Sequence, residues 1–194
     1  MTQTRVAFYG DSYTLGTGAS DAAHRWSTII CAQRGWLEFN PSVNGLGFVR
    51  NRQAFGDGDL PSKIVESNPD IVFVALGLND NFAFATEADR IRVQISTDLE
   101  FLRLALPAAR IIVVEPFWYT DDRPDSLAVI SGWVRSAAAF IHADYVEGAS
   151  HWIEHHPEWM AADAEHPNDD GYAHIAVRMD DALTALLEAP ARGR

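Results

Sequence analysis

The chain has 194 residues, 27 acidic against 15 basic side chains, a formal net charge of −12 and one cysteine, Cys31. The acidic balance argues against nucleic acid as a partner, because phosphate backbones are bound by clustered Lys and Arg. A single cysteine excludes an intramolecular disulfide, and no apolar run is long enough for membrane insertion. The N-terminus lacks a basic segment followed by an apolar one, so we expect no signal peptide and a cytoplasmic protein.

Short apolar runs alternate with amphipathic segments along the chain, and residues 1–194 are expected to form one domain. In chain order the pattern predicts a strand at Arg5–Tyr9, a helix at Arg25–Arg34, a weak strand at Leu37–Val43, a short helix at Ser62–Glu66, a strand at Ile71–Leu76, a helix at Thr86–Leu106, a strand at Ile111–Glu115, a helix at about 125–142, a weak strand at Asp144–Val146 and a last helix from near Asn168. This alternation is typical of an α/β protein, a three-layer α/β/α sandwich with a central parallel sheet of about five strands.

Two of these helices carry signals at their first turn. Thr86 followed by Asp89 has the spacing of a capping box. Asn168 or Asp169 is suited to cap the last helix, since both side chains accept hydrogen bonds from free backbone N–H groups.

Polar and glycine residues follow three of the predicted strands. Gly10-Asp11-Ser12 comes after the first strand, Asn44-Gly45-Leu46-Gly47 after the weak second one, and Gly77-Leu78-Asn79-Asp80 after the third. Each segment by itself also fits an ordinary turn. Because ligands of parallel sheets bind beyond the carboxyl ends of the strands, the three segments are expected to meet at one rim. They would supply a serine hydroxyl, backbone N–H donors and an amide NH₂ group.

A carboxylate and an imidazole stand three residues apart before the last helix, at Asp163 and His166. Within one turn of chain the Asp can fix the tautomer of the His ring and stabilise the imidazolium that forms when the ring takes a proton. The segment also fits a polar helix entry with a solvated His.

Taken together, these segments resemble the GDSL, or SGNH, hydrolase family, whose four blocks are marked by Ser, Gly, Asn and His. Ser12 in GDS, Gly45, Asn79 in GLND and His166 in DAEH match the blocks in order and in approximate spacing. The first block continues GDSYT in place of GDSL, and the second block is short, so that Gly47 competes with Gly45. The resemblance covers nearly the whole chain and implies the flavodoxin-like fold of that family.

The resemblance also implies a serine esterase that works through an acyl-enzyme. Ser12 would be the nucleophile, His166 the base and Asp163 the residue that orients it, while Ser12, Gly45 and Asn79 would form the oxyanion hole. No cofactor and no metal are expected. The fold does not choose the substrate, because family members act on acyl esters of lipids, sugars and thioesters.

Aromatic residues near the predicted rim could stack on a sugar ring or line an acyl channel, and we expect the substrate to be a small-molecule or carbohydrate ester with a short acyl group such as acetyl. Phe82 and Tyr119 are among the aromatics in these loops, and the residues named as substrate contacts are Asp11, Phe48, Asp80, Trp118 and Trp152. A lysophospholipase or thioesterase activity is the alternative of the same class. A non-catalytic carbohydrate-binding protein is the alternative of another class, although binding has no need of a nucleophile with a matched base.

Two further motifs compete with this interpretation. His151-Trp152-Ile153-Glu154-His155 matches the H-x-x-E-H pattern of inverted zinc proteases, but the room between Gly148 and Pro157 allows only about two helical turns. Gly16-Thr17-Gly18 hints at a dinucleotide loop but lacks the third glycine. We interpret the first as a loop beside the site and the second as a turn.

Overall fold

The computed structural model describes residues 3–55 and 59–188. Five parallel strands form one sheet in the order β2-β1-β3-β4-β5. The strands are β1 (Arg5–Gly10), β2 (Leu37–Phe39), β3 (Ile71–Ala75), β4 (Arg110–Val114) and β5 (Asp144–Val146). This strand order is that of the flavodoxin-like doubly wound fold, so the predicted fold class is confirmed.

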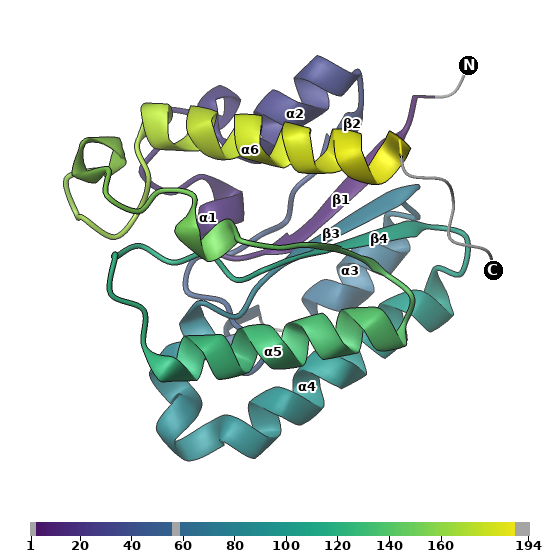
Figure 1. Ribbon diagram of the computed structural model, residues 1–194. Coiled ribbons are helices and arrows are strands. Elements are labelled where there is room, and N and C mark those ends of the chain that lie inside the picture. Colours follow the sequence, from purple (N-terminus) through teal and green to yellow (C-terminus); the bar gives the residue numbers. More distant parts are fainter. Residues whose placement is uncertain (1–2, 56–58, 189–194) are drawn as a thin grey trace.

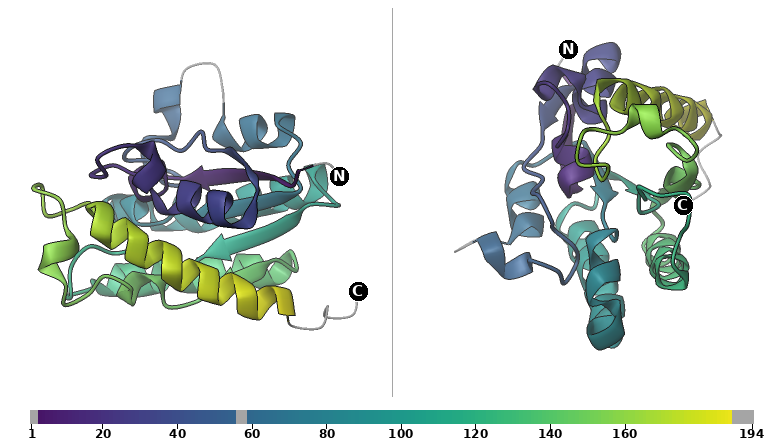
Figure 2. Two further views of the ribbon diagram at one scale, coloured as in Figure 1. Left: turned by 90° about the horizontal axis from the view of Figure 1, so that it is seen from above. Right: turned by 90° about the vertical axis from the view of Figure 1, so that its left-hand side faces the viewer.

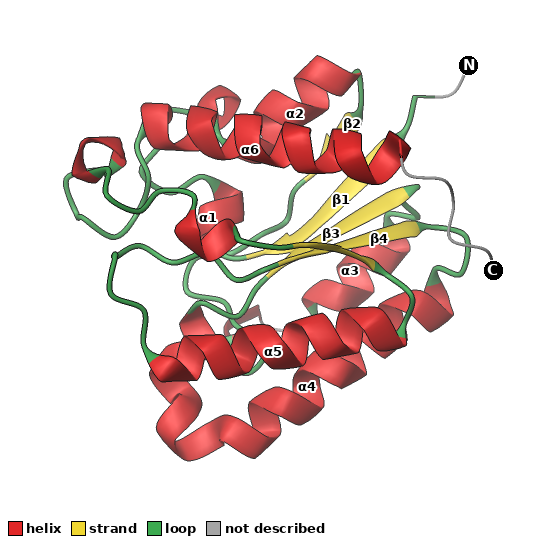
Figure 3. Cartoon of the chain, viewed as in Figure 1, coloured by secondary structure: helices red, strands yellow, loops and turns green. Residues whose placement is uncertain are grey.

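Helices cover both faces of the sheet. The α-helices are α1 (Ser12–Leu15), α2 (Trp26–Arg34), α3 (Leu60–Glu66), α4 (Phe84–Ala105), α5 (Asp125–Phe140) and α6 (Asp169–Glu188). Short 3₁₀ helices are η1 (Ala22–His24), η2 (Arg52–Phe55), η3 (Asn79–Ala83), η4 (Ala149–His151) and η5 (Pro157–Trp159). Figures 1 and 3 show α2 and α6 on one side of the sheet and α3, α4 and α5 on the other.

The two-residue period of the strands divides the core between these layers. Val6 and Phe8 of β1 point toward the cluster that contains α2 and α6, whereas Ala7 and Tyr9 point toward the cluster beneath α3, α4 and α5. The central strands are buried on both faces, as their continuous apolar runs predict. No helix in the described residues is long and apolar enough to cross a bilayer.

Two local predictions need correction. The weak second strand ends at Phe39, because the side chain of Asn40 turns to donate to the Thr14 carbonyl at 2.8 Å and Pro41 has no N–H for the ladder. The capping box at Thr86 is wrong: α4 begins at Phe84, and the Thr86 hydroxyl donates to the Ala83 carbonyl at 3.3 Å.

The predicted cap of the last helix is confirmed at Asn168. Its Oδ1 accepts from the Gly171 N–H at 3.1 Å, one of the first-turn donors that have no partner within the helix. The cap fixes the point at which the loop carrying Asp163 and His166 enters α6.

Candidate active site

The predicted site segments lie at the carboxyl ends of β1 and β3, which are neighbours in the sheet. After β1 the chain forms β2 on one side of this pair, and after β3 it adds the later strands on the other side. Ser12 is the first residue of α1, directly after β1, and Asn79 begins η3 after β3. The loop between η5 and α6 reaches the same rim, as the right-hand view of Figure 2 shows, and its residue His166 lines one cavity with Ser12 and Asn79. In doubly wound sheets this switch point is where ligands bind.

A cavity of about 330 Å³ joins these segments. Four residues predicted as nucleophile, oxyanion donors and base line it together: Ser12, Gly45, Asn79 and His166. The other lining residues are Tyr13, Thr17, Asn44, Leu78, Phe82, Tyr119 and Glu165. A second hollow of about 370 Å³ between α5 and β5 contains none of the predicted site residues.

The turn after β1 holds Ser12 in a nearly buried position. Asp11 caps α1, because its Oδ1 accepts from the Tyr13 N–H at 2.9 Å. Gly10 is required beside it, since a Cβ atom there would lie 2.4 Å from the Thr14 hydroxyl oxygen. Ser12 itself has 5% of its surface exposed, and its N–H is among the first-turn donors of α1. The hydroxyl and this N–H of Ser12 therefore lie at the carboxyl end of β1.

His166 is oriented by Asp163. The Nδ1 atom of the ring lies 2.7 Å from Asp163 Oδ2, and the backbone N–H of His166 donates to Oδ1 at 3.0 Å. The His166 side chain is the largest cause that lowers the pKa of Asp163 to about 2, with the Glu165 N–H next. Because Nδ1 is held by the carboxylate, Nε2 is the ring nitrogen left for proton transfer in the cavity.

The loop of His166 is anchored on the segment after α1. Tyr13 donates its hydroxyl to the Glu165 carbonyl at 2.8 Å, and Tyr172 of α6 donates to the Thr17 carbonyl at 2.7 Å. A Cβ atom at Gly18, whose φ is +93°, would lie 2.5 Å from the Pro167 carbonyl oxygen. The Gly16–Gly18 segment therefore packs against the His166 loop, where close backbone approach explains its second glycine.

The loop after β2 distinguishes Gly45 from Gly47. Gly45 lines the cavity with a φ of +72°. The Gly47 N–H donates to the Arg50 carbonyl at 2.9 Å, and a Cβ at Gly47 would lie 2.5 Å from a carboxylate oxygen of Asp80. Gly47 is thus committed to packing, and Gly45 is the glycine whose backbone faces the cavity.

Asn79 connects the loop after β2 to the buried Asp11. Its Nδ2 atom donates to the Leu46 carbonyl at 2.9 Å and approaches Asp11 Oδ2 at 3.4 Å. Both contacts hold the NH₂ group near Ser12 and Gly45. Asp11 is buried, and desolvation is the largest cause that raises its pKa to about 7.

Asp11 and Asp80 were expected to contact substrate, and the structure does not bring either to the wall of the cavity. Asp80 is fully buried and accepts the N–H groups of Phe48 at 2.7 Å, Val49 at 2.9 Å and Arg50 at 3.2 Å. Burial is the largest cause that raises the pKa of Asp80, and the three N–H donors oppose it. Its carboxylate satisfies the loop backbone and has no face toward a ligand.

The predicted aromatic contacts also need correction. Phe48 is fully buried against Tyr9, and Trp152 is buried against Phe117, so both belong to the core. Trp118 is 5% exposed and does not line the cavity. Its neighbours Tyr119 and Phe82 do.

Besides Phe82 and Tyr119, sequence reasoning left five lining residues out of the predicted site. They are Tyr13, Asn44, Leu78 and Glu165, each next in sequence to a predicted site residue, and Thr17 of the Gly16–Gly18 turn. Adjacency to a marker residue is the signal that could have found the first four, because a loop that presents one residue to a cavity exposes its neighbours there as well.

The H-x-x-E-H segment forms the short η4 followed by turns, so its two terminal histidines do not share a helix face. His151 Nδ1 lies 2.9 Å from Glu154, which Arg123 also contacts at 2.7 Å, and His155 Nδ1 lies 2.8 Å from Asp121. Each histidine therefore has a separate acidic partner, in agreement with the loop interpretation.

Comparison with known proteins agrees with this geometry. The model of the GDSL-like lipase/acylhydrolase family matches residues 8–174. A GDSL lipase of Mycobacterium tuberculosis is 26% identical over 190 residues, which are 94% of this chain and 82% of that protein.

Solved structures with the same fold include three esterases. The psychrotrophic esterase EstA of Pseudoalteromonas superposes with a TM-score of 0.76 at 15% identity, over 95% of this chain and 99% of that one. A family two carbohydrate esterase of Cellvibrio japonicus gives 0.77 at 17% identity, over 97% and 62%. An acetyl-xylooligosaccharide esterase of Geobacillus gives 0.69 at 16% identity, over 98% and 97%. With the family model spanning all four marker residues, the chain belongs to the GDSL-like lipase/acylhydrolase family and is a carboxylic ester hydrolase.

Proposed function

We propose that this protein is a serine esterase that removes short acyl groups, such as acetyl, from a small molecule or a carbohydrate through an acyl-enzyme on Ser12. One observation carries the proposal: Ser12, Gly45, Asn79 and His166 line one cavity, and His166 is held by Asp163 at 2.7 Å. A nucleophile, a base with its orienting carboxylate and oxyanion donors are what acyl transfer requires.

The proposed reaction has two halves. Ser12 Oγ attacks the ester carbonyl carbon while His166 Nε2 takes the hydroxyl proton, and His166 then gives that proton to the departing alcohol. A water molecule then gives a proton to His166 Nε2 and attacks the acyl carbonyl carbon, the bond to Ser12 Oγ breaks, and His166 returns the proton to Ser12 Oγ as the acid leaves. Asp163 keeps Nδ1 protonated and stabilises the imidazolium in both halves.

Three donors would receive the charge that develops on the carbonyl oxygen. They are the N–H groups of Ser12 and Gly45 and the NH₂ group of Asn79. Removal of one such donor typically slows an acyl-transfer enzyme by about 10²–10³-fold. The two NH₂ hydrogens of Asn79 already face the Leu46 carbonyl at 2.9 Å and Asp11 Oδ2 at 3.4 Å, so donation to the oxyanion would take the place of the longer contact.

The size of the cavity supports a short acyl group. Its volume of about 330 Å³ is at the lower end of ligand pockets in general, which span ~300–1,000 Å³. Two structural relatives are carbohydrate esterases by name, which supports a sugar ester among the small substrates. We also propose that residues 1–194 act as one domain.

The test is the replacement of Ser12 by Ala. We expect hydrolysis of p-nitrophenyl acetate to fall by about 10⁶-fold, because the nucleophile acts as a unit with its base. A fluorophosphonate probe should label the wild-type protein and not the variant. A Ser126→Ala variant, changed at the start of α5, serves as the matched control and should keep both turnover and labelling. Turnover or labelling that survives in Ser12→Ala would contradict the proposal.

A further inference from the structure

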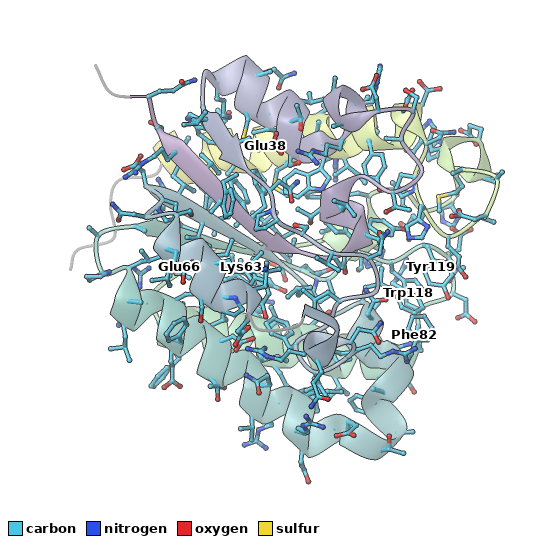
Figure 4. All side chains as sticks on the ribbon, turned by 180° about the vertical axis from the view of Figure 1, so that it is seen from behind. Glu38, Lys63, Glu66, Phe82, Trp118 and Tyr119 are labelled. Carbon is cyan, nitrogen blue, oxygen red and sulfur yellow. The ribbon has the colours of Figure 1, made fainter. Side chains whose placement is uncertain are left out.

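Three aromatic rings form a wall beside the cavity, which we call the aromatic wall: Phe82, Trp118 and Tyr119. The Phe82 and Trp118 ring centroids are 6.3 Å apart with planes 29° apart, and those of Trp118 and Tyr119 are 4.7 Å apart with planes 38° apart. Figure 4 shows the three side chains in a column at one edge of the molecule. Phe82 follows β3 and the other two follow β4, so two neighbouring strands build the wall.

The middle ring is fixed and the outer two are presented to the cavity. Trp118 is buried, and its indole N–H is within hydrogen-bond distance of the Thr120 hydroxyl at 2.8 Å and the Asp122 carbonyl at 3.0 Å. Phe82 and Tyr119 line the cavity, and 52% of the Phe82 surface is exposed. The hydrogen-bonded Trp118 ring thus packs against two rings that line the same cavity as Ser12 and His166.

The other lining residues of this cavity include polar ones. Thr17 donates its hydroxyl to Asn44 Oδ1, which leaves the NH₂ group of Asn44 as its donor toward a ligand. Glu165 also belongs to the lining, and the exposed Arg50 guanidinium lies 6.0 Å from the Phe82 ring centroid. The cavity therefore offers apolar ring faces together with hydrogen-bonding groups.

A pyranose ring has the complementary chemistry, with C–H faces that pack on aromatic rings and an edge of hydroxyl groups. A straight acyl chain has no hydroxyl group that could accept a hydrogen bond from the Asn44 NH₂ group. We infer that the aromatic wall is a stacking platform for the sugar ring of the alcohol half of the substrate, with Phe82 and Tyr119 as specificity-determining residues. This inference rests on the proposed esterase function.

The inference and its alternatives predict different relative rates for three esters, of which two are acetates and one has a longer acyl chain. Peracetylated methyl xylopyranoside carries the ring, ethyl acetate has the same acyl group without a ring, and ethyl hexanoate has a longer acyl chain without a ring. The nitrophenyl ester is avoided here, because its leaving group is itself an aromatic ring that would stack on the wall. Acid release is followed by pH-stat.

The variants are Phe82→Ala and Tyr119→Ala, with Tyr119→Phe as the conservative variant that keeps the ring. Phe140→Ala is the matched control, since Phe140 is 71% exposed at the end of α5 and outside the cavity. Trp118 is left unchanged because it is buried. We expect kcat/KM for the sugar acetate to fall by about 10-fold in each alanine variant, the loss typical of one stacked ring contact. The fall should appear mainly as a higher KM, and Tyr119→Phe should restore most of the activity.

The inference predicts that Phe82→Ala and Tyr119→Ala lower turnover of the sugar acetate by a clearly larger factor than turnover of ethyl acetate, and that Phe140→Ala leaves both unchanged. Equal losses on ethyl acetate, a loss confined to ethyl hexanoate, or no loss on the sugar acetate would each overturn it. Failure of the proposed function is a distinct result: wild-type protein would then hydrolyse none of the three esters, or Ser12→Ala would hydrolyse them as well as wild type.

Discussion

Two carboxylates lie close to the same cavity in opposite environments. Asp11 is buried beneath Ser12, where desolvation raises its pKa to about 7. Asp163 is largely exposed in the loop before α6, where the His166 side chain and two backbone N–H groups lower its pKa to about 2. The comparison shows that the surroundings, and not the residue type, set the ionisation of each carboxylate. Buried Asp11 holds the turn after β1 in place, whereas Asp163 in the loop before α6 stays ionised.

The largest effect should come from the loop. We expect His166→Ala to lower kcat by about 10⁶-fold and Asp163→Ala by about 10⁴-fold, because the base transfers the proton and the carboxylate assists it. Asp121→Ala is the matched control, since Asp121 holds the exposed His155 at 2.8 Å in a similar pair outside the cavity. Steady-state kinetics on p-nitrophenyl acetate measure all three variants. Equal activities of Asp163→Ala and Asp121→Ala would remove the distinction between the two Asp–His pairs.

The buried carboxyl group of Asp11 should make the stability of the protein depend on pH. A group whose pKa is raised on folding stabilises the protein below its unfolded pKa, and this contribution is lost as the pH rises through the folded value. For Asp11 the window runs from about pH 4 to its folded pKa of about 7. Asp80 of η3, Tyr13 and Asn79 face the same carboxyl, and Asp80 raises its pKa further.

We therefore expect the unfolding free energy of wild type to fall by about 2 kcal/mol more than that of Asp11→Asn between pH 5 and pH 7, at ~1.4 kcal/mol for each pKa unit. Urea unfolding at the two pH values measures the difference. Asp163 adds no slope in this window, because its contribution is lost only as the pH falls toward 2. Parallel pH dependences in wild type and variant would show that Asp11 does not titrate there.

The smallest effect should come from the link between the two regions. Tyr13 follows Ser12 in α1 and donates its hydroxyl to the Glu165 carbonyl, in the loop that carries His166, at 2.8 Å. Tyr13→Phe keeps the ring packing and removes this bond, so we expect a loss of about 1 kcal/mol in stability. We also expect kcat to fall several-fold, since the loop carries His166. Tyr145→Phe, outside the cavity, is the control, and an unchanged kcat in Tyr13→Phe would show that the loop is positioned without this bond.

The sheet could be predicted from sequence because its central strands are unbroken β-branched runs that must be buried on both faces. The ends of the elements could not. Leu37–Val43 combines strand-forming residues with Asn40 and Pro41, and the ladder ends at Phe39, where the side chain of Asn40 donates to the Thr14 carbonyl in another element. Thr86 has the spacing of a cap, although the helix had already begun two residues earlier.

The residues that meet in the cavity could be predicted because the marker residues follow strands or precede a helix, where topology alone brings them to one rim. The substrate contacts could not, since aromatic and acidic residues in rim loops have two uses. Phe48 and Trp152 fill the core beneath the loops, and Asp80 receives loop N–H groups, whereas Phe82 and Tyr119 reach the cavity. Which use applies depends on the path of the loop, and a pattern of residue types does not specify that path.

The pairing of Asp80 with Gly47 has a consequence for how this enzyme can be altered. The Asp80 carboxylate occupies the space that any side chain at position 47 would need, and three backbone N–H groups depend on it. Any side chain at position 47 would displace the Asp80 carboxylate and leave these N–H groups without their acceptor, so position 47 is restricted to Gly by a residue 33 positions later in the sequence. Laboratory evolution toward new substrates should therefore accumulate changes at the exposed positions of the rim and leave this pair untouched.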